Sequence, residues 1–208
     1  MRIALTRPEG RNEELAERLR ALGHEVLVRP LIATEPLGDG PVDLEGYDWV
    51  VVTSPNGAAE LARRARGRAG RTAAIGAATA AELPWPADLV PAVSTQEGLL
   101  AELPSPAGRV LVAAAEGARR LLVDELGADF VALYRTVELA QTAFPDADLV
   151  VLASASAARA YAATGARAPA VSIGPQTTAA AREAGVTVTR EARTHDLEGL
   201  VEACSSPS

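Results

Sequence analysis

The chain has 208 residues, 48% of them hydrophobic, a length that can bury the core of one large domain or of two small ones. Its net charge of −7 and pI of about 5.0 provide no basic surface for nucleic acid or for an anionic membrane. All 20 basic residues are arginine, which excludes a Schiff-base lysine and a lysine-containing phosphate loop. With one cysteine and two histidines, we expect no internal disulfide and no structural metal.

The first apolar run, residues 3–5, is too short for a signal peptide. No stretch approaches the roughly 20 apolar residues of a membrane span. We therefore expect a cytoplasmic protein.

Short runs rich in valine, isoleucine and leucine alternate with segments of helical period, a pattern typical of a parallel sheet flanked by helices. Residues 3–5 are predicted as a buried strand, 12–22 as a helix that ends at Gly23, and 25–28 as the next strand. Later predicted strands, each followed by a helical stretch, are 49–52, 72–75, 110–112, 149–152 and 170–173. The predicted class is α/β.

Three segments recur in the same order in the two halves of the chain, which indicates a duplication. The matched segments are 3–19 with 110–126, 48–54 with 148–154, and 75–79 with 173–177, at offsets of 107, 100 and 98 residues. Duplication predicts two similar α/β lobes with a cleft between them, but it leaves open whether the halves exchange their first units. Proline-flanked residues 34–40 and the stretch 134–144 are the predicted crossings between lobes.

Small polar residues follow the predicted strands, where open α/β sheets bind ligands and helix N-termini present free backbone N–H groups. One interpretation is that Thr53, Ser54, Ser154 and Ser156 are helix N-caps, each contributing about 1 kcal/mol. The other is that all these turns together form an anion-binding surface. The candidate binding residues are Thr6, Arg7, Thr53, Ser54, Asn56, Gly57, Gly76, Thr79, Ser154, Ser156, Gly174, Pro175, Gln176 and Thr177.

Several single residues leave two interpretations open. Gly76 and Gly174 either form turns or let the backbone approach a ligand closely. Tyr134 is either a packing group or a proton donor that faces the cleft. The other candidates are arginines that either pair with substrate carboxylates or lie in solvent, Arg7, Arg119 and Arg135, and histidines expected to be structural or exposed, His24 and His195.

The chain lacks the motifs of a serine triad, a zinc protease, a dinucleotide site and a dithiol redox site. What remains is binding, or chemistry in which positioning of the substrate supplies most of the barrier reduction.

An ordered set of segments carries a family resemblance: residues 5–8, 48–57, 75–79, 133–136, 152–156 and 173–177. In these segments and their order the sequence resembles the uroporphyrinogen-III synthases over nearly its whole length. The resemblance implies two flavodoxin-like lobes with parallel sheets joined by a two-stranded connector. It places 1–33 with 140–208 in one lobe and 37–134 in the other, with 34–36 and 135–139 as connectors.

The resemblance also implies a lyase of tetrapyrrole and heme biosynthesis that uses no cofactor. Its substrate would be hydroxymethylbilane, clamped in the cleft through its eight carboxylates and cyclised to uroporphyrinogen III with inversion of the terminal pyrrole and loss of water. Tyr134 is the implied catalytic residue, which assists departure of the hydroxyl although an ordinary phenol is a weak acid. We expect a monomer that binds neither nucleic acid nor membrane.

Two alternatives come from other classes of protein. A two-lobed sensor of an anionic small molecule would bind without catalysis. A single-lobe regulator would need a cluster of aspartates after the first strand, where this chain has Thr6 and Arg7.

Overall fold

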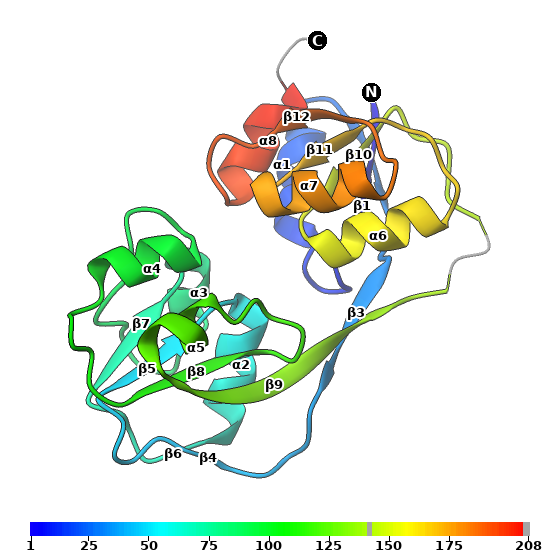
Figure 1. Cartoon of the computed structure of the whole chain (residues 1–208). Helices are drawn as coiled ribbons and strands as arrows, with labels where there is room; N and C mark the ends of the chain where they lie inside the picture. The colour runs from blue at the N-terminus through cyan, green and yellow to red at the C-terminus, as the bar shows by residue number, and fades with distance from the viewer. Residues whose placement is uncertain (141–142, 206–208) are drawn as a thin grey trace. The chain divides into compact units, whose positions relative to one another are not determined.

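The computed structural model describes residues 1–140 and 143–205, which form two compact units (Figure 1). Unit 1 consists of Met1–Ala33 and Val137–Ser208, and unit 2 of Thr34–Thr136. The chain therefore passes between the units twice. The second predicted crossing, 134–144, contains residues 141 and 142, which lie outside the described residues.

Unit 1 is built on a five-stranded parallel sheet of order β12-β11-β10-β1-β2. Its first strand lies beside β10, nearly 150 residues away in the sequence, with Ile3 opposite Leu149. The elements of this unit are β1 (Arg2–Leu5), α1 (Glu13–Ala21), β2 (Glu25–Val28), β10 (Leu149–Leu152), α6 (Ala155–Ala163), β11 (Ala170–Ser172), α7 (Pro175–Glu183), β12 (Val188–Glu191) and α8 (Leu197–Ser205).

Helices cover both faces of the unit 1 sheet because successive residues of a strand point to opposite faces. Ile3 and Leu5 pack with α1 and α8, whereas Ala4 packs with α6 and α7. All three side chains are fully buried. This double burial explains why the strand has no alternating polar residues.

Unit 2 contains a five-stranded sheet of order β3-β9-β8-β5-β7, in which β9, β8, β5 and β7 are parallel. A two-stranded sheet pairs β4 with β6. The elements are β3 (Ile32–Pro36), β4 (Val42–Asp43), β5 (Trp49–Val52), α2 (Pro55–Arg64), β6 (Ala65–Arg66), β7 (Arg71–Ala74), α3 (Ala77–Ala81), α4 (Gln96–Glu102), β8 (Val110–Ala115), α5 (Leu121–Leu126) and β9 (Asp129–Glu138).

The β3 and β9 strands carry the chain through its two crossings and pair with each other. Backbone hydrogen bonds from Leu37 N to Leu133 O and from Leu139 N to Leu31 O continue this pairing at both ends. As the residue number rises on one strand it falls on the other, so the two run antiparallel. The predicted two-stranded connector and the α/β class are confirmed.

Matched segments of the sequence occupy the same place in each sheet. The neighbours β1, β10 and β11 of unit 1 correspond to β8, β5 and β7 of unit 2. In unit 2, α2 packs on one face of the sheet, and α4 and α5 pack on the other. The strand predicted at 72–75 lies one residue earlier, at β7.

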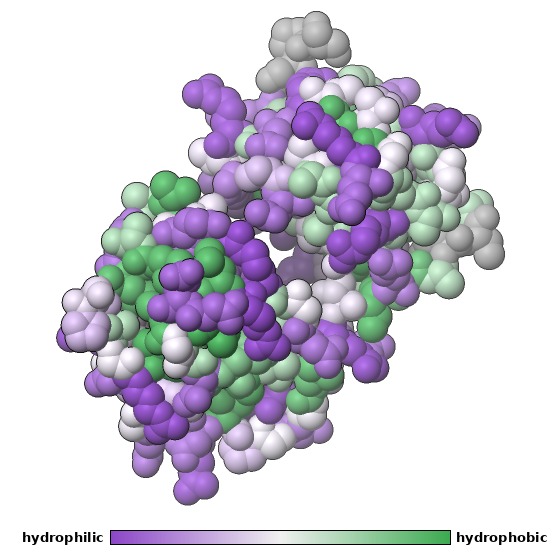
Figure 2. Space-filling model, viewed as in Figure 1, coloured by the Kyte–Doolittle hydropathy of each residue, from purple (hydrophilic) through white to green (hydrophobic). Residues whose placement is uncertain are grey.

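The face shown in Figure 2 is largely polar, although hydrophobic residues gather on the part that belongs to unit 2. The exposed large hydrophobic residues are Val90 and Val93 in unit 2 and Met1, Leu22 and Leu139 in unit 1. Within the described residues, no helix is both long enough and apolar enough to span a bilayer.

Candidate functional site

The carboxyl end of β5 in unit 2 holds four of the predicted site residues. Ser54 is the N-cap of α2 and accepts a hydrogen bond of 3.0 Å from Gly57 N, while Pro55 occupies the first turn. A Cβ at Gly57 would lie 3.0 Å from Ser54 Oγ, so glycine keeps this cap close to the helix. Thr53 and Asn56 are half-buried at the same edge.

Tyr134 reaches this edge from β9. Its hydroxyl lies 2.9 Å from Ser54 Oγ, and its side chain is buried. The register between β8 and β9 shifts at this point, with Ala114 opposite Ala132 but Ala115 opposite Tyr134. The extra residue puts Leu133 and Tyr134 into the same core cluster, where regular alternation would separate them. The bulge therefore turns the phenol toward Ser54.

The second predicted turn of unit 2 follows β7. Gly76 has extended backbone and precedes α3, which has no side-chain cap. A Cβ on Gly76 would lie 2.8 Å from Ser94 Oγ, so Ser94 occupies the space beside this glycine. Thr79 is buried in the first turn of α3.

In unit 1, the loop after β1 carries Thr6 and Arg7. The Thr6 hydroxyl donates to Val151 O at 2.8 Å and is fully buried, so it ties this loop to β10. Asn12 Nδ2 donates to the carbonyl oxygens of Arg7 at 2.9 Å and Pro8 at 3.1 Å. These bonds fix the backbone that presents Arg7.

The Arg7 guanidinium is half-buried, and within residues 1–140 and 143–205 it has no ion pair and no hydrogen bond. Burial, followed by repulsion from Arg11, lowers the pKa of Arg7 below its ordinary value. A guanidinium still stays charged at physiological pH. Glu14 and Glu13 partly offset this lowering of the pKa, but neither forms an ion pair with Arg7, and a partly dehydrated cation of this kind favours binding of an anion.

The turn after β10 resembles its counterpart in unit 2. Ser154 caps α6 by accepting a hydrogen bond of 3.1 Å from Ala157 N. Ser156 Oγ accepts a bond of 3.4 Å from Arg159 Nη2. The capping interpretation is therefore observed for Ser54 and Ser154, and capping leaves each hydroxyl hydrogen available to a second acceptor.

Unlike the turn after β10, the turn after β11 has no side-chain cap. Gly174 precedes α7 without a side-chain cap, and Pro175 takes the first turn. Thr177 is only 4% exposed, and its hydroxyl has no partner among the described residues. The next residue, Thr178, is instead bound to Ser172 and Glu191. This turn, which also includes Gln176, therefore keeps backbone N–H groups and one hydroxyl for a ligand.

Each unit thus gathers its predicted residues at one edge of its own sheet, at the carboxyl ends of adjacent parallel strands. We call these the unit 1 edge, after β1, β10 and β11, and the unit 2 edge, after β5 and β7, to which Tyr134 contributes from within β9. Hydroxyls, backbone amides and a guanidinium bind carboxylates, and a phenol can supply a proton. No strong acid or base is among these residues.

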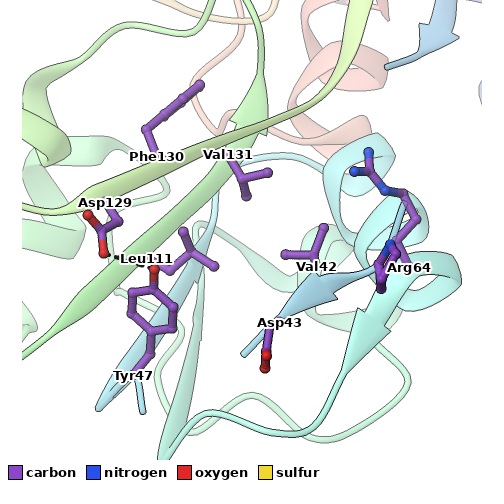
Figure 3. A pocket seen from close by; sticks show the side chains of 9 residues that line it. Val42, Asp43, Tyr47, Arg64, Leu111, Asp129, Phe130 and Val131 are labelled. Atoms are coloured by element: carbon purple, nitrogen blue, oxygen red, sulfur yellow. Dashed lines mark hydrogen bonds between the residues drawn. The ribbon is translucent and has the colours of Figure 1, made fainter. Parts of the chain in front are cut away.

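A separate pocket of about 460 Å³ lies near the opposite ends of the unit 2 strands (Figure 3). Tyr47 OH donates to Asp129 Oδ2 at 2.8 Å beside it, and Arg109 lies 4.3 Å above the Tyr47 ring. Hydrogen bonds from the Tyr47 hydroxyl and from Arg109 hold the pKa of Asp129 below its ordinary value. The pocket contains none of the predicted site residues.

Residues 13–202 match the family model described as uroporphyrinogen-III synthase HemD. The chain belongs to the uroporphyrinogen-III synthase family.

Single relatives agree with this membership. A protein of Methanocaldococcus jannaschii, named as a candidate uroporphyrinogen-III synthase, is 28% identical over 151 residues, which cover 66% of this chain and 63% of that protein. The chain thus spans less than two thirds of that relative's length. A crystal structure of a mutant uroporphyrinogen III synthase from Thermus thermophilus is 20% identical, covers 97% of this chain and 95% of its own, and has a TM-score of 0.59. This likeness supports the fold.

Two arginines considered for substrate binding already have partners in this member of the uroporphyrinogen-III synthase family. Arg119 pairs with Glu97 at 2.7 Å, and Arg135 pairs with Glu35 at 2.7 Å. Arg7 is the candidate whose charge is not engaged in this way. Sequence alone ranked the three together because ion pairing depends on which loops meet in space.

Proposed function

We propose that the chain is a uroporphyrinogen-III synthase that converts hydroxymethylbilane to uroporphyrinogen III, with inversion of the terminal pyrrole and loss of water. The observation that carries this proposal is the family match across 13–202, because it includes the turns of the unit 2 edge and, in unit 1, the turns after β10 and β11. The enzyme would act in the cytoplasm as a monomer, without cofactor or nucleic acid.

Substrate binding, in this proposal, is shared between the two edges. Arg7 and the uncapped turn Gly174–Thr177 offer a charge, backbone amides and a hydroxyl to the carboxylates of the bilane. On the unit 2 edge, Thr53, Asn56, Gly76 and Thr79 contribute further polar groups. Holding the flexible chain in one geometry can supply several kcal/mol of barrier reduction through lost freedom of motion.

Tyr134 is the proposed catalytic residue. Ser54 Oγ accepts from Gly57 N, so its own hydrogen can be donated to the Tyr134 oxygen 2.9 Å away. The Tyr134 hydrogen is then directed to the hydroxyl group of the bilane. As the C–O bond breaks, that hydroxyl leaves as water with the donated proton, and the Ser54 hydrogen bond stabilises negative charge on the phenol oxygen.

Inversion follows from geometry rather than from a strong acid or base. After water leaves, the substituted α-carbon of the terminal pyrrole bonds to the methylene carbon that carried the hydroxyl, which gives a spiro intermediate. The bond from this α-carbon to its original methylene bridge then breaks. The freed methylene bonds to the unsubstituted α-carbon of the same pyrrole, and that carbon loses its proton. The edges would favour this outcome by fixing the carboxylates that surround the reacting carbon. The contacts that bind the substrate would then also select the product isomer.

The test is incubation of the purified chain with hydroxymethylbilane, followed by oxidation and chromatographic separation of the porphyrin isomers. We expect isomer III to dominate, whereas a buffer control gives isomer I. A chain that binds the bilane but yields only isomer I would be a sensor, and the proposal would be wrong.

A further inference from the structure

Two loops with the same construction precede α4 and α8, and the residues Glu-Gly-Leu follow in both, at 97–99 and at 198–200. In unit 2, Thr95 Oγ1 accepts from Gly98 N at 3.0 Å. In unit 1, Asp196 Oδ1 accepts from Gly199 N at 2.8 Å. A Cβ on either glycine would collide with a carbonyl oxygen of its own loop, that of Val93 or of Thr194. Both loops are therefore tightly held.

Each loop places one side chain over the glycine of a site turn. In unit 2 this residue is Ser94, which lies beside Gly76. In unit 1 it is His195, and a Cβ on Gly174 would lie 2.9 Å from His195 Cδ2 and 3.0 Å from Nε2. Only a glycine admits the ring this close. His195 is thus seated on the backbone at the start of α7.

The surroundings of His195 leave its imidazole available to a ligand. The side chain is half-buried, and no described residue forms a hydrogen bond with the ring. The adjacent Asp196 carboxylate is bound by Thr194 Oγ1 and Gly199 N, each at 2.8 Å. The ring adjoins the uncapped turn in which Thr177 is buried without a partner among the described residues. An imidazole N–H beside such a turn suits a carboxylate.

We propose that His195 is a further substrate-binding residue of the unit 1 edge, which donates a hydrogen bond to a carboxylate of the bilane. The inference rests on the proposed function. The matching Ser94 gives the unit 2 edge a smaller donor, a hydroxyl. The two edges therefore differ in how strongly they hold a carboxylate at equivalent positions.

The experiment compares His195→Phe, which keeps a flat ring against Gly174 but removes the donor, with His195→Gln, which restores an N–H. We expect the Phe variant to raise KM for hydroxymethylbilane about tenfold, with kcat within about twofold. The Gln variant should keep KM within about threefold of the wild type. His24→Phe, at the start of β2 and the opposite end of the sheet, is the matched control and should leave KM unchanged.

An unchanged KM in His195→Phe would overturn the inference. So would equal losses in the Phe and Gln variants, because they would assign His195 to packing. Thermal unfolding of all variants is measured alongside to identify a loss of folding. If the wild type itself forms only isomer I, the proposed function fails and this inference fails with it, whereas isomer III from the wild type isolates the test to His195.

Discussion

The Tyr134 hydroxyl owes its position to one extra residue in β9. Because of the bulge opposite Ala115, Tyr134 joins the face of the sheet that carries Leu133 and reaches Ser54. A regular strand would have placed one of these two side chains on the other face. The position of the proposed acid thus depends on the backbone register as much as on the identity of the residue.

Replacing Tyr134 with phenylalanine removes the hydroxyl and keeps the ring in its core cluster. We expect kcat to fall about 100-fold, the lower end of the usual contribution of general acid catalysis, with KM within about twofold. Single-turnover and steady-state assays with isomer analysis measure both. Tyr47→Phe, near the other end of the sheet, is the control and should keep full activity. Full activity in the Tyr134 variant would remove this residue from the mechanism.

The sequence identified Tyr134, Ser54 and Arg7 as candidates but could not rank them. The bulge that orients Tyr134 has no local signal in residues 129–138. The freedom of Arg7 is visible only once Arg119 and Arg135 are seen paired with Glu97 and Glu35. His195 was expected to be structural or exposed because the glycine beside it lies 21 residues earlier in the sequence, and residues 93–98 and 194–199 share too few residues to be matched by sequence.

At the scale of elements, the cap of α8 links pH to stability. Asp196 accepts from Gly199 N and from the Thr194 hydroxyl, and these bonds lower the pKa of its carboxyl. Because the pKa of Asp196 is lower in the folded state than in the unfolded state, its carboxylate stabilises the fold at pH values above the unfolded-state pKa. That stabilisation is lost as the pH falls through the folded-state pKa.

We therefore expect Asp196→Ala to reduce the free energy of unfolding by about 1 kcal/mol at pH 7. The deficit should shrink below about pH 4, where the wild-type carboxyl also becomes protonated. Asp196→Asn keeps an acceptor for Gly199 N and should lose far less at pH 7. Urea unfolding at both pH values measures the differences. An equal deficit for the Ala variant at pH 7 and pH 3 would contradict the account.

Seven strands were predictable because each contains a short apolar run, and most helices begin after a polar or glycine residue. The strands β3, β4, β6, β9 and β12 were not predicted, because they are very short or contain charged residues. The helix predicted at 12–22 is α1 at 13–21, and the predicted strands match to within a few residues. The partners of the strands were not predictable from the residues. Residues 3–5 and 110–112 are equally apolar, so either could pair with 50–51 or with 150–151, and hydrophobic pattern alone cannot choose.

For the whole molecule, the pairing of β1 with β10 makes the stability of unit 1 depend on both ends of the chain. Leu19 of α1 is fully buried in the core shared with Leu200 of α8. Its replacement by alanine should cost about 2–5 kcal/mol. Hydrogen exchange read by mass spectrometry should then speed up in peptides from 149–191 as well as in those from 1–28.

Peptides from 49–115 should keep their protection in the Leu19 variant. Leu61→Ala, a fully buried leucine of α2, is the matched control and should give the reverse pattern. Faster exchange throughout the chain in both variants would mean that the two units unfold as one. That the connectors are residues 34–36 and 135–139 stays a prediction. Hydrogen exchange of these stretches in the same experiment tests these bounds.

The same discontinuity imposes an order on synthesis at the ribosome. Residues 1–28 are made first, yet their sheet neighbour β10 is translated more than 100 residues later, a delay on the order of 10 s. Unit 2 is contiguous and can finish folding in that interval. During this interval the nascent β1-α1-β2 segment has an unpaired strand edge, the side of β1 that later pairs with β10. We expect chaperones to bind the segment mainly in this period.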